Sequence, residues 1–177
     1  MNICVFGSSS NSVAPIYKNA ALELGRALAL QGHTLVFGGY DMGLMGAVAA
    51  GAAEMGGPVV GVITNTLEGS GRAVFPCTEV ISSADLTARK TKMIEMSDAF
   101  VTMPGGLGTF DEFFTVMSLV KAGESHAKSA LYNVAEYFNP LIRMLEDSCE
   151  KGLNSTDWRD SCNAFTNPDE LIAWLEA

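Results

Sequence analysis

The hydrophobic positions of the chain follow two alternating patterns. Short apolar runs, such as residues 2–6 (NICVF), are typical of strands buried on both faces of a sheet. Longer segments, such as residues 15–31, carry apolar side chains at helical spacing and end before a glycine, here Gly32. By the same criteria, further strands are predicted at residues 34–37, 59–63, 99–103 and 128–133, and further helices at 44–55, 84–96, 109–122, 140–151 and 168–175.

The order strand, helix, strand, helix predicts the fold class. Such an order forms right-handed crossovers and a parallel sheet with helices on both faces. We therefore expect an α/β protein in which residues 1–177 form one domain, a Rossmann-like, doubly wound parallel sheet. The stretch 64–83 has no clear periodicity and is predicted to be a surface loop. In the helix that follows it, we expect Leu86, Met93 and Ile94 to face inward.

Charge narrows the choice of partners. The 177 residues carry a formal net charge of −9, which repels nucleic acids and anionic membranes. We therefore expect neither a nucleic-acid polymer nor a membrane as a partner. A local pocket can still be positive, because Arg72, Arg89, Lys90 and Lys92 fall close together in the chain. The alternative is that these four side chains form a solvated helix face.

The cysteines predict neither a disulfide framework nor a metal site. The chain has four cysteines, none of them in a CxxC pair, and two histidines. Scattered thiols fit a reducing, cytoplasmic location. The first residues, MNICVFG, have neither a positive leader region nor a long apolar stretch, so we expect no signal peptide and no membrane-spanning helix.

Candidate chemistry lies at three strand ends that carry glycines. They are GSSS at residues 7–10, Gly38-Gly39, and PGGLGT at residues 104–109. In an open parallel sheet, ligands bind at the carboxyl ends of the strands. Glycines there let backbone N–H groups approach an anion, and the following helix N-terminus favours a phosphate. These glycines alternatively serve only tight turns; the sequence has neither a Walker A loop nor the dinucleotide fingerprint at these positions.

Two carboxylates follow the third of these strand ends. Asp111 and Glu112 fall in the first turns of the predicted helix, where acidic residues often only complement the helix dipole. A carboxylate beside a phosphate loop is less ordinary, since two anions repel each other. It becomes sensible when the carboxylate acts on a sugar, one ring away from the phosphate.

These residues resemble a known family. PGGLGTFDE at residues 104–112 matches the PGGxGTxxE motif of the LOG family, the cytokinin riboside 5′-monophosphate phosphoribohydrolases, which often carry the label "lysine decarboxylase-like". GLMG at 43–46, Arg89-Lys90 and SDAF at 97–100 also match. The resemblance extends from about residue 3 to residue 152.

The resemblance implies roles for individual residues. The catalytic pair of the family corresponds to Arg89 and Glu112. Glu112 is expected to stabilise an oxocarbenium-like transition state or to activate water, and Arg89 to offset charge on the departing base. Arg89 alternatively holds the base or the phosphate. The expected substrate-binding residues are Ser8, Gly39, Lys90, Gly105, Gly106, Leu107, Gly108, Thr109 and Ser118, the last in place of a family threonine.

The resemblance also implies a function, with departures that leave the substrate open. We expect a hydrolase that cleaves the N-glycosidic bond of a purine nucleoside 5′-monophosphate, without cofactor or metal, in a homodimer. Tyr40 replaces a family glycine, and the loop at 66–83, expected to cover the base, differs from plant members. The substrate is therefore a cytokinin riboside monophosphate, AMP or another purine monophosphate.

Two other functions remain at this point. One is a non-catalytic carrier of a phosphorylated ligand such as molybdenum cofactor, which needs the glycine loops but not Arg89 and Glu112. The other is amino-acid decarboxylation with pyridoxal phosphate, for which no lysine has a supporting context.

Overall fold

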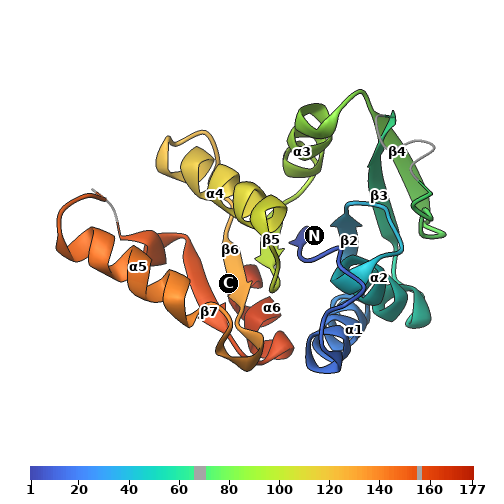
Figure 1. Ribbon diagram of the computed structural model, residues 1–177, viewed down its shortest axis with the longest axis horizontal. Helices are drawn as coiled ribbons and strands as arrows, with labels where there is room; N and C mark the ends of the chain where they lie inside the picture. The colour runs from blue at the N-terminus through green and yellow to red at the C-terminus, as the bar shows by residue number, and fades with distance from the viewer. Residues whose placement is uncertain (66–70, 155–156) are drawn as a thin grey trace.

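The fold is a seven-stranded, wholly parallel sheet with helices on both faces (Figure 1). We analysed a computed structural model, which describes residues 1–65, 71–154 and 157–177. Within these ranges the strand order is β4-β3-β2-β1-β5-β6-β7. The strands are β1 (Asn2–Phe6), β2 (Thr34–Phe37), β3 (Val59–Thr64), β4 (Glu79–Ser83), β5 (Ala99–Thr102), β6 (Ser129–Tyr132) and β7 (Cys162–Phe165).

The helices form two layers. On one face α1, α2 and α6 pack over a continuous apolar core, and on the other α3, α4 and α5 cover two smaller clusters. No helix in the described ranges is long and apolar enough to cross a membrane. The helices are α1 (Pro15–Leu30), α2 (Gly43–Glu54), α3 (Leu86–Glu95), α4 (Leu107–Lys121), α5 (Asn139–Glu150) and α6 (Pro168–Glu176), with short 3-10 turns at Val134–Glu136 and Trp158–Asp160.

The strand order creates a crevice at β1. From β1 the chain winds outward through β2, β3 and β4 on one side, then returns to pair β5 with the other side of β1. Helices that follow strands on opposite sides of such a reversal diverge, and they leave a crevice above the strand ends. The loops after β1, β2 and β5 therefore meet at one place.

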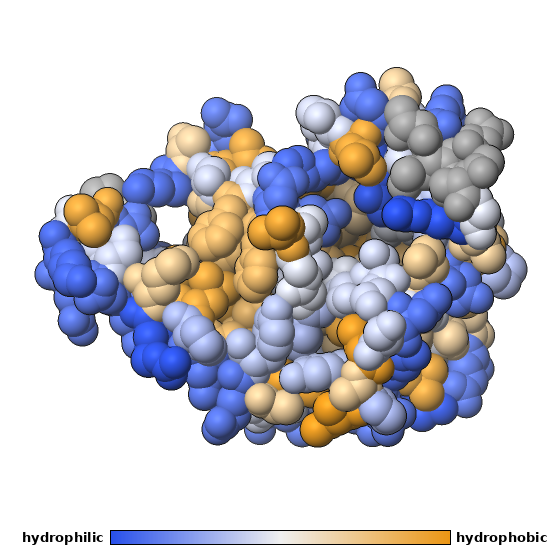
Figure 2. Space-filling view, in the orientation of Figure 1, coloured by the Kyte–Doolittle hydropathy of each residue, from blue (hydrophilic) through white to orange (hydrophobic). Residues whose placement is uncertain are grey.

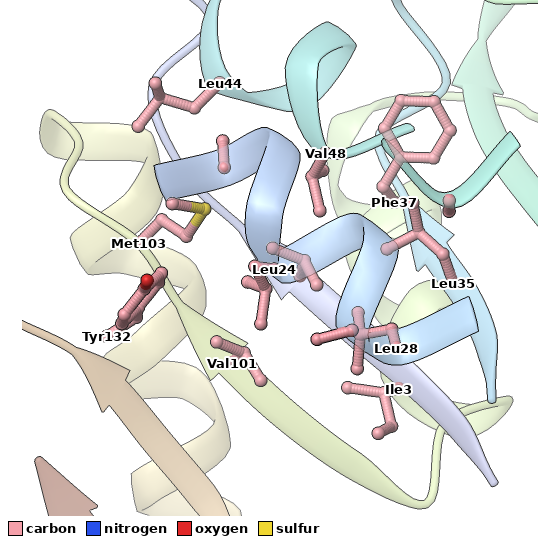
Figure 3. Packing of buried hydrophobic residues seen from close by; sticks show 14 of the residues in the cluster. Ile3, Leu24, Leu28, Leu35, Phe37, Leu44, Val48, Val101, Met103 and Tyr132 are labelled. Carbon is pink, nitrogen blue, oxygen red and sulfur yellow. The ribbon is translucent and has the colours of Figure 1, made fainter. Parts of the chain in front are cut away.

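The main core shows why residues 15–30 form a helix. Pro15 takes the first helical position, where its missing N–H costs nothing. Leu24 and Leu28, one turn apart, are fully buried and point toward Ile3 and Val101 of the central strands (Figure 3). Burial of each leucine side chain contributes about 2 kcal/mol.

Helices α1 and α2 touch through two glycines, a contact that we call the glycine seam. A Cβ atom on Gly25 would lie 2.0 Å from the carbonyl oxygen of Val48, and one on Gly51 would lie 2.1 Å from that of Leu22. Neither glycine has a positive φ. The seam therefore needs glycine for the close approach of the two helices and not for its backbone conformation.

The predicted fold class is confirmed, and the predicted helices and strands agree with the structure to within a few residues at each end. The sequence prediction missed two strands. Residues 79–83 form β4, although 64–83 was predicted to be a loop, and residues 162–165 form β7. Both are edge strands whose side chains are mostly exposed or half-buried, so they lack the apolar runs of the central strands. Residues 66–70 of the same predicted loop lie outside the described ranges.

Candidate active site

A cavity of about 400 Å³ opens at the crevice above β1. The loops after β1 and β2 form its floor, and the first turns of α3 and α4 form its walls. Four sequence-predicted groups meet there: Ser8, Arg89, Glu112 and the segment 106–109. The chain therefore brings both candidate catalytic residues to the place where an open parallel sheet binds its ligands.

The end of the cavity at α4 is formed by an uncapped helix N-terminus. Gly106 precedes the helix with extended backbone, and no side chain caps it. The N–H groups of the first turn lack carbonyl partners within the helix, so they can donate to a phosphate. Gly105 makes room for Thr109, because a Cβ atom on Gly105 would lie 2.1 Å from the Thr109 hydroxyl oxygen. The Tyr137 hydroxyl donates to the carbonyl oxygen of Gly105 and ties this loop to the turn before α5.

Arg89 reaches the cavity from α3. Asp85 caps that helix by accepting a hydrogen bond from the N–H of Ala88 at 2.8 Å. The guanidinium of Arg89 donates from Nε to the carbonyl oxygen of Val62 at 2.7 Å and from Nη2 to that of Gly38 at 2.8 Å. Burial lowers the pKa of Arg89 from its ordinary value, although the Glu112 carboxylate opposes that shift. The group still carries its charge at neutral pH, because an arginine pKa starts far above 7.

Glu112 reaches the same cavity from α4. It lies four residues after Gly108, and positions four apart share one face of a helix. Burial raises the pKa of Glu112 to about 7; the neighbouring Asp111 adds to the rise, while Arg89 and Lys90 oppose it. Near neutral pH the carboxyl group therefore exists in both protonation states, as a group that exchanges protons with water or substrate requires.

Arg89 and Glu112 face one cavity without closing on each other. Each shifts the pKa of the other, yet no oxygen of Glu112 lies within 4 Å of a nitrogen of Arg89. A direct ion pair would neutralise both groups and occupy the space between them. Their separation leaves room for a ligand whose reacting bond lies between the positive guanidinium and the negative carboxylate.

Three other candidates stand beside the cavity and do not line it. Lys90 forms an ion pair with Asp111 at 2.7 Å and so joins α3 to α4. Gly39 turns the chain with a φ of +78°, a conformation that favours glycine. Gly105 lies behind Thr109, as described above.

Ser118 lies elsewhere. It is exposed on α4 and lines a second hollow of about 440 Å³ between α4 and α5, together with Phe113, Phe114 and Met117. Figure 2 shows apolar side chains gathered between these two helices. Within one chain, Ser118 therefore does not contact the cavity that holds Arg89 and Glu112.

Sequence reasoning missed several residues of the cavity wall. Gly38 was recognised only as part of a glycine pair, and Arg72 only as part of a basic cluster, although both line the cavity. Tyr40 is 8% exposed, and its ring lies 5.9 Å from the Arg72 guanidinium carbon. Leu86 was expected to face the core, but it is 57% exposed at the cavity, one turn before Arg89. An apolar residue can either line a pocket or pack in the core, and the sequence around Leu86 does not distinguish the two.

Nothing in the described ranges gathers three or more metal-ligating side chains: no such cluster of histidine, cysteine, aspartate or glutamate occurs there. The cavity contributes one carboxylate, that of Glu112, beside the arginines. Its charged side chains therefore suit an organic anion better than a metal ion.

Comparison with known proteins gives consistent relatives. The family model described as "Possible lysine decarboxylase" matches residues 45–175. A probable cytokinin riboside 5′-monophosphate phosphoribohydrolase of rice, LOGL2, is 38% identical over 98% of this chain and 71% of its own length. The Arabidopsis thaliana enzyme LOG4 is 37% identical over 98% of this chain and 81% of its own length.

Solved structures share the fold at lower identity. The structural-genomics target TM1055 superposes with a TM-score of 0.77 at 23% identity, covering 99% of this chain and 98% of its own. The molybdenum cofactor binding protein of Rippkaea orientalis superposes with a TM-score of 0.72 at 19% identity, covering 99% of this chain and 94% of its own. At these identities the likeness establishes the fold alone.

Proposed function

This chain belongs to the LOG family of cytokinin riboside 5′-monophosphate phosphoribohydrolases, and from that premise we propose that it hydrolyses the N-glycosidic bond of a purine nucleoside 5′-monophosphate. The products are the free base and ribose 5-phosphate. One observation supports the proposal above all others: Arg89 and Glu112 face one cavity, beside a helix N-terminus suited to a phosphate. These three features match the three parts of the substrate.

The phosphate end fixes the substrate. The free N–H groups at the start of α4 and the Thr109 hydroxyl bind the 5′-phosphate, helped by the positive end of the helix dipole. Lys90, paired with Asp111, lies beside this end and adds positive charge. Binding energy from the phosphate then holds the sugar at a fixed place between Arg89 and Glu112.

The reaction divides between the two charged groups. As the bond from C1′ to the base nitrogen breaks, its electron pair goes to the base and positive charge develops on the sugar ring. The Glu112 carboxylate stabilises that charge and takes a proton from the water whose oxygen bonds to C1′. The Arg89 guanidinium offsets the negative charge on the base, which takes up a proton from solvent water, and Glu112 returns its proton to solvent.

The base end carries side chains that set specificity. Tyr40 and Arg72 form one part of the wall, and Met42 and Met45 line it as well. Tyr40 fills space that a glycine would leave open, so a plain purine fits this wall at least as well as a prenylated one. We include AMP and cytokinin riboside monophosphates in the proposed substrate class. A cytoplasmic homodimer is part of the same proposal.

A carrier function is the second candidate. The likeness to molybdenum cofactor proteins supports only a shared fold. A carrier needs a phosphate-binding loop, but it does not need two oppositely charged side chains held apart across the cavity. The separation of Arg89 and Glu112 therefore favours hydrolysis.

Decarboxylation with pyridoxal phosphate does not fit the cavity. That chemistry needs a lysine to hold the cofactor as a Schiff base. None of the described residues that line the cavity is a lysine, and the nearby Lys90 is paired with Asp111. The cavity therefore does not support the decarboxylase activity that the family description names.

Release of free base from AMP and from isopentenyl-AMP tests the proposal. We expect the wild type to release base and Glu112→Gln to lose about 100-fold or more in kcat. Glu95→Gln, an exposed glutamate on α3 outside the cavity, is the matched control and should keep wild-type rates. Absence of base release from both nucleotides by folded protein would refute the proposal and favour the carrier.

A further inference from the structure

The backbone of two neighbouring strands holds the Arg89 side chain. Its Nε donates to the carbonyl oxygen of Val62 in β3, and its Nη2 donates to that of Gly38, the residue after β2. These partners lie 27 and 51 positions away in the chain. Nη1 has no hydrogen-bond partner among the described residues, so its two N–H groups remain free for a ligand.

Gly38 gives the guanidinium the space it occupies. A Cβ atom at this position would lie 1.9 Å from Nη2 and 3.1 Å from Cζ of Arg89, and its third-nearest atom would be Nη1 of the same residue at 3.8 Å. The backbone of Gly38 does not itself require glycine, because its φ is not positive; Gly39 next to it has a φ of +78°. The two glycines of the pair are therefore needed for different reasons.

The sheet order says which end of the cavity this arrangement serves. The start of α4, where the proposed phosphate binds, follows β5, while Gly38 directly follows β2 and Val62 lies in β3, on the other side of β1. Two strand spacings, about 10 Å, separate β2 from β5. That is the scale of a nucleotide measured from phosphate to base, so the anchored guanidinium lies toward the base.

We propose that Gly38 is a positioning residue for Arg89. Because Gly38 has no Cβ, the guanidinium fits beside it. The carbonyl oxygens of Gly38 and Val62 then hold the guanidinium at the base end of the cavity, with Nη1 directed toward the departing base. This inference rests on the proposed hydrolase function. It assigns Arg89 to the leaving base and not to the phosphate.

Gly38→Ala tests the assignment through the rate. The methyl group displaces the guanidinium, and a displacement of about 1 Å in a catalytic group costs about 100-fold in rate. We expect kcat for AMP to fall by about that factor. The affinity for ribose 5-phosphate, measured by calorimetry, should stay within about twofold, because the phosphate end is untouched. A kcat within twofold of wild type, or an affinity loss equal to the rate loss, would overturn the proposal.

A thermal cycle separates positioning from general damage. We expect Gly38→Ala to lower the Tm in the wild-type background but not in an Arg89→Ala background, where the methyl group meets no side chain. Gly61→Ala is the matched control on β3. Its Cβ would lie 2.7 Å from the Cys77 sulfur, so its Tm penalty should persist in both backgrounds. An equal Gly38→Ala penalty in both backgrounds would overturn the proposal.

The two readouts also distinguish this inference from the proposed function. If the wild type releases no base, the hydrolase is refuted. The thermal cycle needs no turnover, and it would still support or overturn the packing of the Arg89 side chain against Gly38. If the wild type is active and either readout fails as stated, only the role of Gly38 is refuted.

Discussion

The buried carboxyl group of Glu112 makes the stability of this protein depend on pH in a specific way. Burial raises the pKa of Glu112 from the usual 4.5 to about 7. Below pH 4.5 the group is protonated in both the folded and the unfolded chain. Between pH 4.5 and 7 the folded chain keeps a proton that the unfolded chain releases, so the free energy of unfolding falls as the pH rises.

The expected magnitude follows from that pKa. At about 1.4 kcal/mol per pKa unit, Glu112 costs the folded state about 3 kcal/mol once the pH is above 7. Glu112→Gln cannot ionise and avoids the cost. We therefore expect the variant and the wild type to be similarly stable at pH 4.5 and the variant to be about 3 kcal/mol more stable at pH 8. For a chain of this size, that corresponds to a Tm difference of roughly 6 to 12 °C.

Urea and thermal unfolding, followed by circular dichroism from pH 4.5 to 8, measure this difference. Subtracting the two curves removes other titrating groups common to both proteins, such as His33, whose pKa burial lowers. Glu95→Gln, at an exposed position, should give a flat difference from wild type. A flat difference for Glu112→Gln as well would show that its pKa is not raised. A difference of the opposite sign would show that Arg89 outweighs burial.

Three further predictions concern other parts of the molecule. Gly25→Ala should lower the free energy of unfolding in urea by about 1–3 kcal/mol, because the methyl group forces α1 and α2 apart; a gain of about 1 kcal/mol, usual for alanine in a helix, would refute the seam. Tyr137→Phe removes the donor to the Gly105 carbonyl and should weaken ribose 5-phosphate binding about fivefold by calorimetry; unchanged affinity would show that the loop holds itself. Ala135→Gly should raise the free energy of unfolding by roughly 0.5–1 kcal/mol, since Ala135 has a φ of 50°; a lower Tm would contradict this reasoning.

The central part of the fold could be predicted because each element carries its own signal. The buried run at residues 2–6 and the helical spacing at residues 15–31 depend only on neighbours in the chain. Strand β4 shows the limit. Its sequence, EVISS, pairs with β3 along one edge only and leaves most side chains exposed. An edge strand of this kind is stabilised by pairing with a neighbouring strand, which the local sequence does not reveal.

The candidate site was likewise only partly predictable from the sequence. The segment 104–112 is contiguous, so one motif predicted the helix N-terminus and Glu112 together. The anchoring of Arg89 joins residues from three separate elements, and nothing near Arg89 in the chain indicates Gly38 or Val62 as its partners. Ser118 shows the converse. Its correspondence to a family threonine suggested a binding role, but its helix face turns it away from the cavity of its own chain.

The glycine seam between α1 and α2 offers a way to read the history of related chains. Gly25 and Gly51 are constrained by the contact between two helices, while Arg89 and Glu112 are constrained by the reaction proposed above. Substitution of the charged pair would remove the proposed activity and leave the fold intact. Substitution of the seam glycines would disturb the fold and, with it, the activity. On the proposed function, a distant relative with glycine at both seam positions and neither charged residue would therefore keep the fold without the hydrolase activity.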